Sequence, residues 1–159
     1  MTMHFNEIIL GLFVINLAMA SGAGLYESRI VIPMWFHGSV VDTEAIKSTD
    51  VGRKFWGWVT TIPLTLLTII NIVEALGSEG PLRKWWLAAT ALILLERTGT
   101  FGFFIPTIIR LGKPDLWPES YTLSVANGWM KLNKVRIGLN LAGLLASMVA
   151  YTLLIYSTR

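Results

Sequence analysis

Four long apolar stretches, each able to cross a membrane as a helix, constrain this chain more than any other feature. They cover residues 8–35, 55–76, 85–110 and 129–156. A hydrocarbon core about 30 Å thick needs roughly 20 helical residues per crossing. The composition agrees, since 53% of the residues are hydrophobic and only 14% are charged. The sequence therefore predicts an all-α, up-down-up-down bundle of four transmembrane helices that forms one domain over residues 1–159.

The distribution of basic residues predicts how the bundle is oriented. The leading residues MTMHFNEII carry no Lys or Arg, so the first stretch is interpreted as a permanent span and not as a signal peptide. Four spans place both termini on one side. Three basic residues flank the spans there and six on the other side: Arg83, Lys84 and Arg159 against Lys47, Arg53, Lys54, Lys113, Lys131 and Lys134. The positive-inside rule then predicts an inner-membrane protein with both termini outside and its two longer loops in the cytoplasm.

A faint internal repeat links the two halves of the chain. The segments YESRIVIPMW and ERTGTFGFFIPTI each pair a Glu and an Arg upstream of Ile-Pro. Each following span begins near a Trp and carries an Asn further along, at Trp58 and Asn71 and at Trp129 and Asn140. Two helical hairpins in parallel repeat would produce this pattern. Chance resemblance between unrelated helices stays open as the alternative.

Several kinds of chemistry are excluded by residues that the sequence lacks. Without cysteine there are no disulfides, thiolate metal sites, iron–sulfur clusters or c-type haem. Neither the Glu-x-x-His di-iron motif nor HExxH, GxSxG or a phosphate loop occurs. The net charge of +3 does not indicate a nucleic-acid binder. No motif encodes a cofactor.

The two histidines limit the options for haem and metal. His4 and His37 flank the first span on opposite sides of the membrane, which excludes bis-histidine haem within one monomer. His37 is the only candidate ligand, either for a single-His haem or for a metal shared with Asp42 or Glu44. An ordinary residue at the membrane boundary is the commoner role for such a histidine.

Charged side chains inside the spans point to a polar interior. A charge in the bilayer costs at least roughly 2.5 kcal/mol, so Glu27, Arg29, Glu96, Arg97 and Arg136 need partners. Every span has one face of small or polar residues at helical spacing, and turning the four faces inward gives each charge a neighbour. Glu27 and Arg136 lie at equal depth, which predicts that they pair, and Glu96 and Arg97 lie near the midplane.

These charges are expected to share one network that lines a pocket open toward the cytoplasm. Structural ion pairs that only hold the helices together are the alternative. Arg97 or Arg136 would stabilise an oxyanion, and Glu27 or Glu96 would act as a base or stay protonated. The candidate catalytic residues are Glu27, Glu96, Arg97 and Arg136. The candidate substrate-binding residues are Arg29, Asn71, Asn140 and Trp129.

Two segments resemble a known family. GAGLYESRIVIPMW ends the first span and WMKLNKVRIGLNLAGLLAS opens the fourth, with an Arg in the third span between them. This arrangement resembles the anthrone-oxygenase-like family of small four-helix membrane proteins. The positions that carry the resemblance are Gly22, Gly24, Pro33, Trp129 and Arg136.

The resemblance implies the oxidation of a lipophilic aromatic or polycyclic substrate by molecular oxygen, without an evident organic cofactor. It also implies that an intramembrane Arg or Glu assists proton abstraction. One departure concerns the fourth span, where fungal members commonly have a His near the Arg and this sequence has Asn133.

The sequence thus leads to a small membrane protein with a charged pocket for a lipophilic small molecule, and an oxygenase-like oxidoreductase is the first hypothesis. A non-enzymatic module that binds or transports a hydrophobic ligand is the second. The third is a structural subunit of a membrane complex, which would need polar residues on the lipid face, and the sequence offers only Ser21 and Thr90. The small-residue faces leave a homo-oligomer open.

Overall fold

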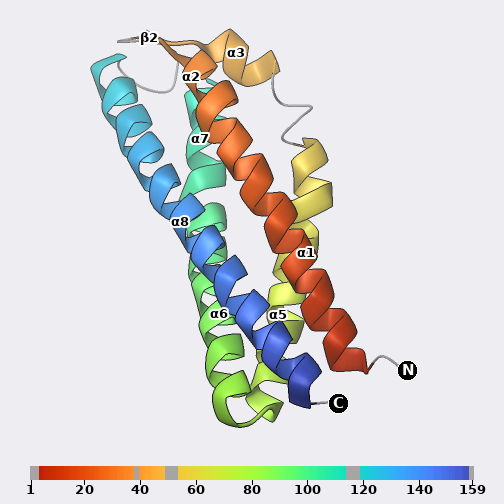
Figure 1. The fold of residues 1–159 in the computed structure, drawn as a ribbon. Helices are drawn as coiled ribbons and strands as arrows, with labels where there is room; N and C mark the ends of the chain where they lie inside the picture. The colour runs from red at the N-terminus through yellow and green to blue at the C-terminus, as the bar shows by residue number, and fades with distance from the viewer. Residues whose placement is uncertain (1–3, 38–39, 49–53, 114–118, 158–159) are drawn as a thin grey trace.

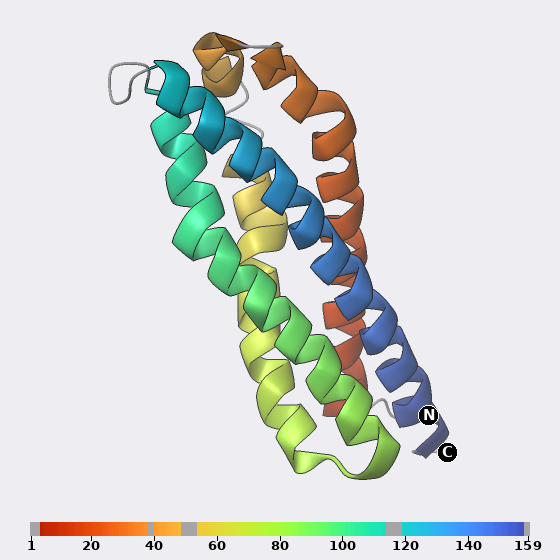
Figure 2. The same ribbon diagram turned by 90° about the vertical axis from the view of Figure 1, so that its left-hand side faces the viewer.

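A computed structural model describes residues 4–37, 40–48, 54–113 and 119–157. Four helices in it are long and apolar enough to cross a membrane: Phe5–Trp35, Lys54–Gly77, Gly80–Leu111 and Tyr121–Ser157. Consecutive spans run in opposite directions, and both termini lie at the same end of an elongated bundle (Figures 1 and 2). The all-α bundle of four transmembrane helices expected from the sequence is therefore confirmed.

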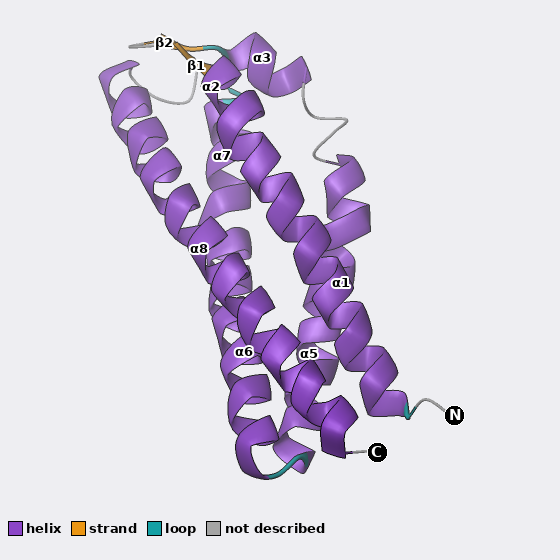
Figure 3. Cartoon of the chain, viewed as in Figure 1, coloured by secondary structure: helices purple, strands orange, loops and turns teal. Residues whose placement is uncertain are grey.

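The spans are divided into shorter elements. The first contains α1 (Phe5–Tyr26), the π-helical turn η1 (Glu27–Val31) and α2 (Ile32–Trp35). The short strands β1 (Phe36–His37) and β2 (Val40–Val41) pair antiparallel, and α3 (Thr43–Ser48) follows them at the end of the bundle away from the termini (Figure 3). The second span contains the π-helical turn η2 (Gly57–Thr61) and α5 (Ile62–Gly77). The third contains α6 (Gly80–Gly99), the π-helical turn η3 (Thr100–Phe104) and α7 (Ile105–Leu111), and α8 (Glu119–Ser157) forms the fourth.

Helix α8 begins well before the span expected from the sequence. The residues before Trp129 are more polar than a membrane span, so hydropathy assigns them to a loop. Tertiary contacts extend the helix, because α8 packs against β2 and Ala126 is buried in an apolar cluster with Trp35 and Ile46. A hydropathy window detects lipid-facing residues and not a helix that continues beyond the lipid.

Each π-helical turn ends directly before an Ile-Pro pair. Proline has no N–H, and its ring collides with the carbonyl four residues back in a regular helix. In all three places the N–H of the isoleucine instead reaches the carbonyl five residues back. The three bonds run from Ile32 to Glu27, from Ile62 to Gly57 and from Ile105 to Thr100. The chain thus accommodates its intramembrane prolines by widening the helix.

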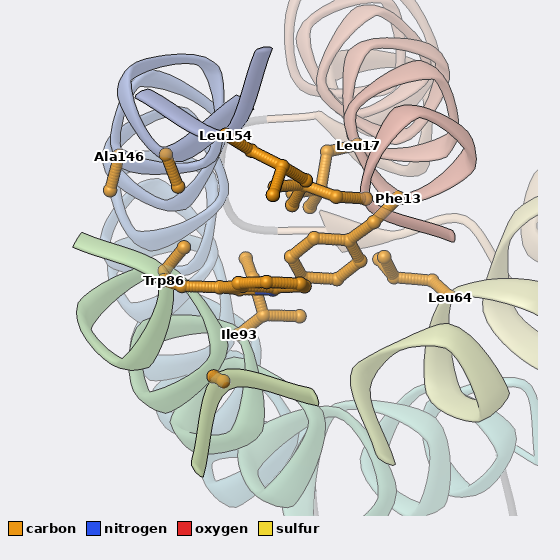
Figure 4. Close-up of a cluster of buried hydrophobic side chains, with 11 residues drawn as sticks. Phe13, Leu17, Leu64, Trp86, Ile93, Ala146 and Leu154 are labelled. Atoms are coloured by element: carbon orange, nitrogen blue, oxygen red, sulfur yellow. The ribbon is translucent and has the colours of Figure 1, made fainter. Parts of the chain in front are cut away.

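Apolar side chains from all four spans fill the half of the bundle next to the termini. Figure 4 shows this cluster, which includes Phe13 and Leu17 of α1, Leu64 of α5, Trp86 and Ile93 of α6, and Ala146 and Leu154 of α8. Helices α6 and α8 approach closely at Gly143, where a Cβ atom would lie 2.5 Å from Cδ1 of Ile93. Helix association in lipid depends on such close packing and on hydrogen bonds.

The outward faces of the spans are covered by large apolar side chains. Leu12, Leu66, Leu95 and Leu145, one from each span, are all exposed. Contiguous apolar surface of this extent is covered by lipid in membrane proteins. Together with the four spans it identifies a small integral membrane protein.

The connection between α5 and α6 is tight. Gly80 has a φ of 61°, a left-handed conformation that suits glycine because it has no Cβ. Pro81 follows in the first turn of α6, where a helix does not need the missing N–H.

Candidate functional site

A cavity of about 300 Å³ lies in the half of the bundle away from the termini, and all four spans line it. The apolar cluster of Figure 4 lies beyond it toward the termini. Among the described residues that line it, the exposed ones are Lys54, Ile105 and Ile109, which come from the second and third spans.

A buried ion pair forms one wall of the cavity. Nε of Arg97 donates a hydrogen bond to Oε2 of Glu96, and Oγ1 of Thr100 donates to Oε1 of the same carboxylate at 2.8 Å. Glu96 is 2% exposed and Arg97 8%. Both carboxylate oxygens thus have protein partners, as a buried ion pair requires.

Arg136 approaches this pair from α8. Its guanidinium carbon lies 4.8 Å from the centroid of the Phe104 ring, a cation–π contact. Like Glu96 and Glu27, Arg136 lines the cavity.

No hydrogen bond or ion pair reaches the Arg136 guanidinium from the residues that the structure describes. The direct pair of Glu27 with Arg136 expected from their equal depth is therefore not formed. Arg136 stacks on Phe104 instead, and the ion pair at this level joins two adjacent residues of the third span, Glu96 and Arg97.

Aromatic rings form a second wall that leads to Arg136. The ring centroids of Trp35 and Trp129 are 6.2 Å apart, and those of Trp129 and Phe104 are 5.8 Å apart. Nε1 of Trp129 donates to the backbone carbonyl of Phe104 at 3.2 Å, which fixes that ring. The wall presents aromatic edges and faces to whatever occupies the cavity.

Three buried polar atoms on the cavity wall have no hydrogen-bond partner in the described ranges: Oγ of Ser21, Nε1 of Trp35 and Oδ1 of Asn140. Their residues are 4%, 3% and 7% exposed. Buried polar atoms are nearly always paired, and an unpaired one costs about 1–3 kcal/mol. The cavity wall therefore contains an indole N–H, an amide oxygen and a hydroxyl whose hydrogen-bonding capacity the described residues leave unused.

The structure brings most of the predicted site residues together. Glu27, Glu96, Arg97, Arg136, Asn140 and Trp129 all line the cavity. Arg29 and Asn71 do not: Arg29 is exposed on η1, and Asn71 is fully buried at the α5–α6 contact, where its Oδ1 accepts a hydrogen bond from Nε1 of Trp86 at 2.9 Å. The sequence places these two in the substrate site, but here they lie outside the cavity.

Sequence reasoning missed part of the cavity wall. Ser21 and Thr90, the two candidates for polar residues on the lipid face, are both buried, at 4% and 1% exposure, and Ser21 lines the cavity. The second span also contributes a π-helical turn, η2. The signal was present, because Ile62-Pro63 is a third copy of the pair seen in the first and third spans.

The side chain of His37 lies outside the part of the chain that is described, so its haem or metal role stays a prediction. Its proposed co-ligands have other contacts. Oδ1 of Asp42 accepts the Ala45 N–H at the start of α3 at 2.8 Å, and Oε1 of Glu44 pairs with Lys47 at 2.9 Å. Within the described ranges, no three His, Cys, Asp or Glu side chains lie close enough to hold a metal.

Comparison of the chain with known protein families, with curated proteins and with solved structures finds no match. Function is therefore inferred from the chemistry of the cavity.

Proposed function

We propose that the protein binds a planar, lipophilic aromatic molecule that carries an oxygen substituent. The observation behind this proposal is the Arg136 guanidinium, which lines the cavity on top of Phe104 without a hydrogen-bond acceptor among the described residues. An intramembrane guanidinium is costly unless it is compensated. A ligand oxygen would supply the charge-assisted hydrogen bonds that it lacks.

The size and walls of the cavity support a flat ligand. Small-molecule sites have volumes of about 300–1,000 Å³, and a cavity of about 150 Å³ holds one benzene ring. A volume of about 300 Å³ therefore suits two or three fused rings. Trp35, Trp129 and Phe104 offer edge-to-face and offset contacts to such rings. Two of the lining residues, Ile105 and Ile109, are exposed and apolar, which suits entry of a lipophilic ligand from the bilayer.

For catalysis we propose an oxygenase-like oxidation of an anthrone-type ketone, with molecular oxygen as the co-substrate. Glu27 accepts the proton from the activated C–H, and Arg136 stabilises the resulting oxyanion. The substrate carbanion then reacts with oxygen, and overall one anthrone and one O2 yield one anthraquinone and one water. Glu96 does not act as the base in this step, because its two carboxylate oxygens already accept hydrogen bonds from Arg97 and Thr100.

Anaerobic titration of the detergent-purified protein with anthrone, followed by tryptophan fluorescence, tests the binding proposal. Loss of a charge-assisted hydrogen bond costs about 1.5–3 kcal/mol, so we expect Arg136→Gln to weaken binding roughly tenfold to a hundredfold. Arg110→Gln is the matched control, because Arg110 is exposed and outside the cavity lining. Equal affinity in the two variants, or no binding by the unmodified protein, refutes the proposal.

Oxygen uptake and anthraquinone absorbance then test the reaction. Turnover that is lost in Glu27→Gln while anthrone still binds supports the assigned proton acceptor. Tight binding with no oxygen uptake excludes the oxygenase reaction and selects the non-enzymatic binding module, the runner-up that the same cavity supports.

We further propose that the cavity end of the bundle faces the cytoplasm and that both termini lie outside an inner membrane. The unequal flanking charges support this orientation. Because the chain has no cysteine, single introduced cysteines can show on which side of the membrane each end of the bundle lies. An impermeant thiol reagent should label Ser78→Cys in intact cells and Ser48→Cys only after lysis, and the reverse order would overturn the orientation.

A further inference from the structure

We propose that Pro33, Pro63 and Pro106 are positioning residues of the cavity. Each holds its span in a π-helical turn, and the widened turns direct polar side chains inward. The ligand used to test this inference comes from the proposed function. The positioning role itself is argued from the residues that line the cavity. All three turns supply lining residues: Glu27 from η1, Gly57, Thr60 and Thr61 from η2, and Thr100 and Phe104 from η3.

The register of the third span shows what the widened turn does. Glu96, Thr100, Phe104 and Ile108 follow one another at intervals of four and all line the cavity. In a regular α-helix each step of four residues turns the side chain about 40° further round, so Ile108 would point roughly 120° away from Glu96. One extra residue in η3 removes about 100° of that difference. Without the π-helical turn, the ion pair and Ile108 would not face the same space.

Neighbouring helices hold two of these turns through hydrogen bonds to backbone carbonyls. Pro63 has no N–H for the carbonyl of Val59, four residues back, and Nδ2 of Asn16 on α1 donates to that oxygen at 3.1 Å. In η3 the contact is of a different kind: the Phe104 carbonyl, which is not one that Pro106 leaves unpaired, accepts the indole N–H of Trp129 on α8. In lipid every backbone group must find a partner within the protein. The turns are thus tied to the tertiary structure at the cavity.

Pro81 provides the matched control. It lies in the first turn of α6, at the opposite end of the bundle, where no π-helical turn accompanies it. A substitution there changes a proline in the same chain without touching the cavity lining.

The test uses Ser21→Cys as a reporter inside the cavity of the otherwise cysteine-free chain. The labelling rate with methyl methanethiosulfonate and the affinity for anthrone are measured with Pro63→Ala, Pro106→Ala or Pro81→Ala added. We expect labelling to slow about tenfold in the first two variants, with a matching loss of affinity, equivalent to about 1.4 kcal/mol. The thermal midpoint should hold or rise, because alanine restores a backbone donor. Pro81→Ala should change neither labelling nor affinity.

Labelling rates in Pro63→Ala and Pro106→Ala equal to that of Pro81→Ala would overturn the inference. So would faster labelling together with a lower thermal midpoint, which is the signature of prolines that only stabilise the bundle. If one variant does not fold, the other decides. Should the unmodified protein bind no anthrone while labelling still slows in both variants, the proposed function fails and the positioning role stands.

Discussion

The hydrogen bond between Asn71 and Trp86 provides a test that separates polar contacts that hold the bundle from those that serve the cavity. Nε1 of Trp86 donates to Oδ1 of Asn71 at 2.9 Å, and Nδ2 of Asn71 donates to the Leu67 carbonyl at 2.8 Å. Asn71 and Trp86 are both fully buried, on α5 and α6. Replacing Asn71 by Leu removes the acceptor and leaves the indole N–H without its partner.

The magnitude follows from the membrane setting. Hydrogen bonds between transmembrane helices contribute about 0.6 kcal/mol on average and about 1.7 kcal/mol at most. Because both partners are 0% exposed, we expect the upper end, about 1.5 kcal/mol. Trp86→Phe removes the donor from the other side. The double variant replaces both polar groups by apolar ones. The losses of unfolding free energy in the two single variants should therefore add up to about 1.5 kcal/mol more than the loss in the double variant.

The assay is unfolding of each variant in mixed micelles with increasing dodecyl sulfate, followed by far-ultraviolet circular dichroism. Anthrone affinity is measured alongside and should be unchanged in all variants. A coupling free energy below about 0.3–0.5 kcal/mol, the usual error of additivity, would refute the hydrogen-bond reasoning. Weaker anthrone binding by Asn71→Leu at unchanged stability would instead return Asn71 to the substrate site.

Three further predictions concern packing and the cavity wall. Gly143→Ala places a Cβ 2.5 Å from Cδ1 of Ile93 and should lower the unfolding free energy by about 1–3 kcal/mol. This loss should be smaller in a protein that also carries Ile93→Ala. Equal losses with and without Ile93→Ala would contradict the contact. Thr100→Val removes the hydroxyl donor to Glu96 and should lower the unfolding free energy by about 1 kcal/mol in the same assay. An unchanged unfolding midpoint would show that this hydrogen bond does not stabilise the protein. Trp129→Phe loses the indole hydrogen bond but keeps an aromatic ring, so it should weaken anthrone binding less than Trp129→Ala does, and equal losses would argue against the aromatic wall.

Much of the candidate site follows from a simple argument about cost. Charges are expensive in lipid, so this cost predicts that Glu27, Arg29, Glu96, Arg97 and Arg136 face inward. Four of them line the cavity, whereas Arg29 is exposed on η1. The same cost predicted that Asn71 lines the cavity, because an asparagine in a span needs a hydrogen-bond partner. The sequence does not show whether that partner is a ligand or another side chain.

The sequence could not predict which of the buried charged side chains pair with each other, and the reason is physical. Equal depth along two helices brought Glu27 and Arg136 to the wall of the same cavity, yet a shared cavity does not make an ion pair. Arg97 is already beside Glu96 on the same helix and bonds it directly. The ring of Phe104 then offers Arg136 a different neighbour.

The sequence by itself determined the four spans, their alternating direction and the inward position of the buried charges. These follow from hydrophobic length and from the cost of placing polar groups in lipid, which act on each segment separately. Only the tertiary structure decided the cavity. Three π-helical turns, each directly before an Ile-Pro pair, shift the helical register by one residue each, and at one of them Asn16 of a neighbouring helix donates to the Val59 carbonyl that Pro63 leaves unpaired. That neighbour is set by packing between helices and not by the local sequence.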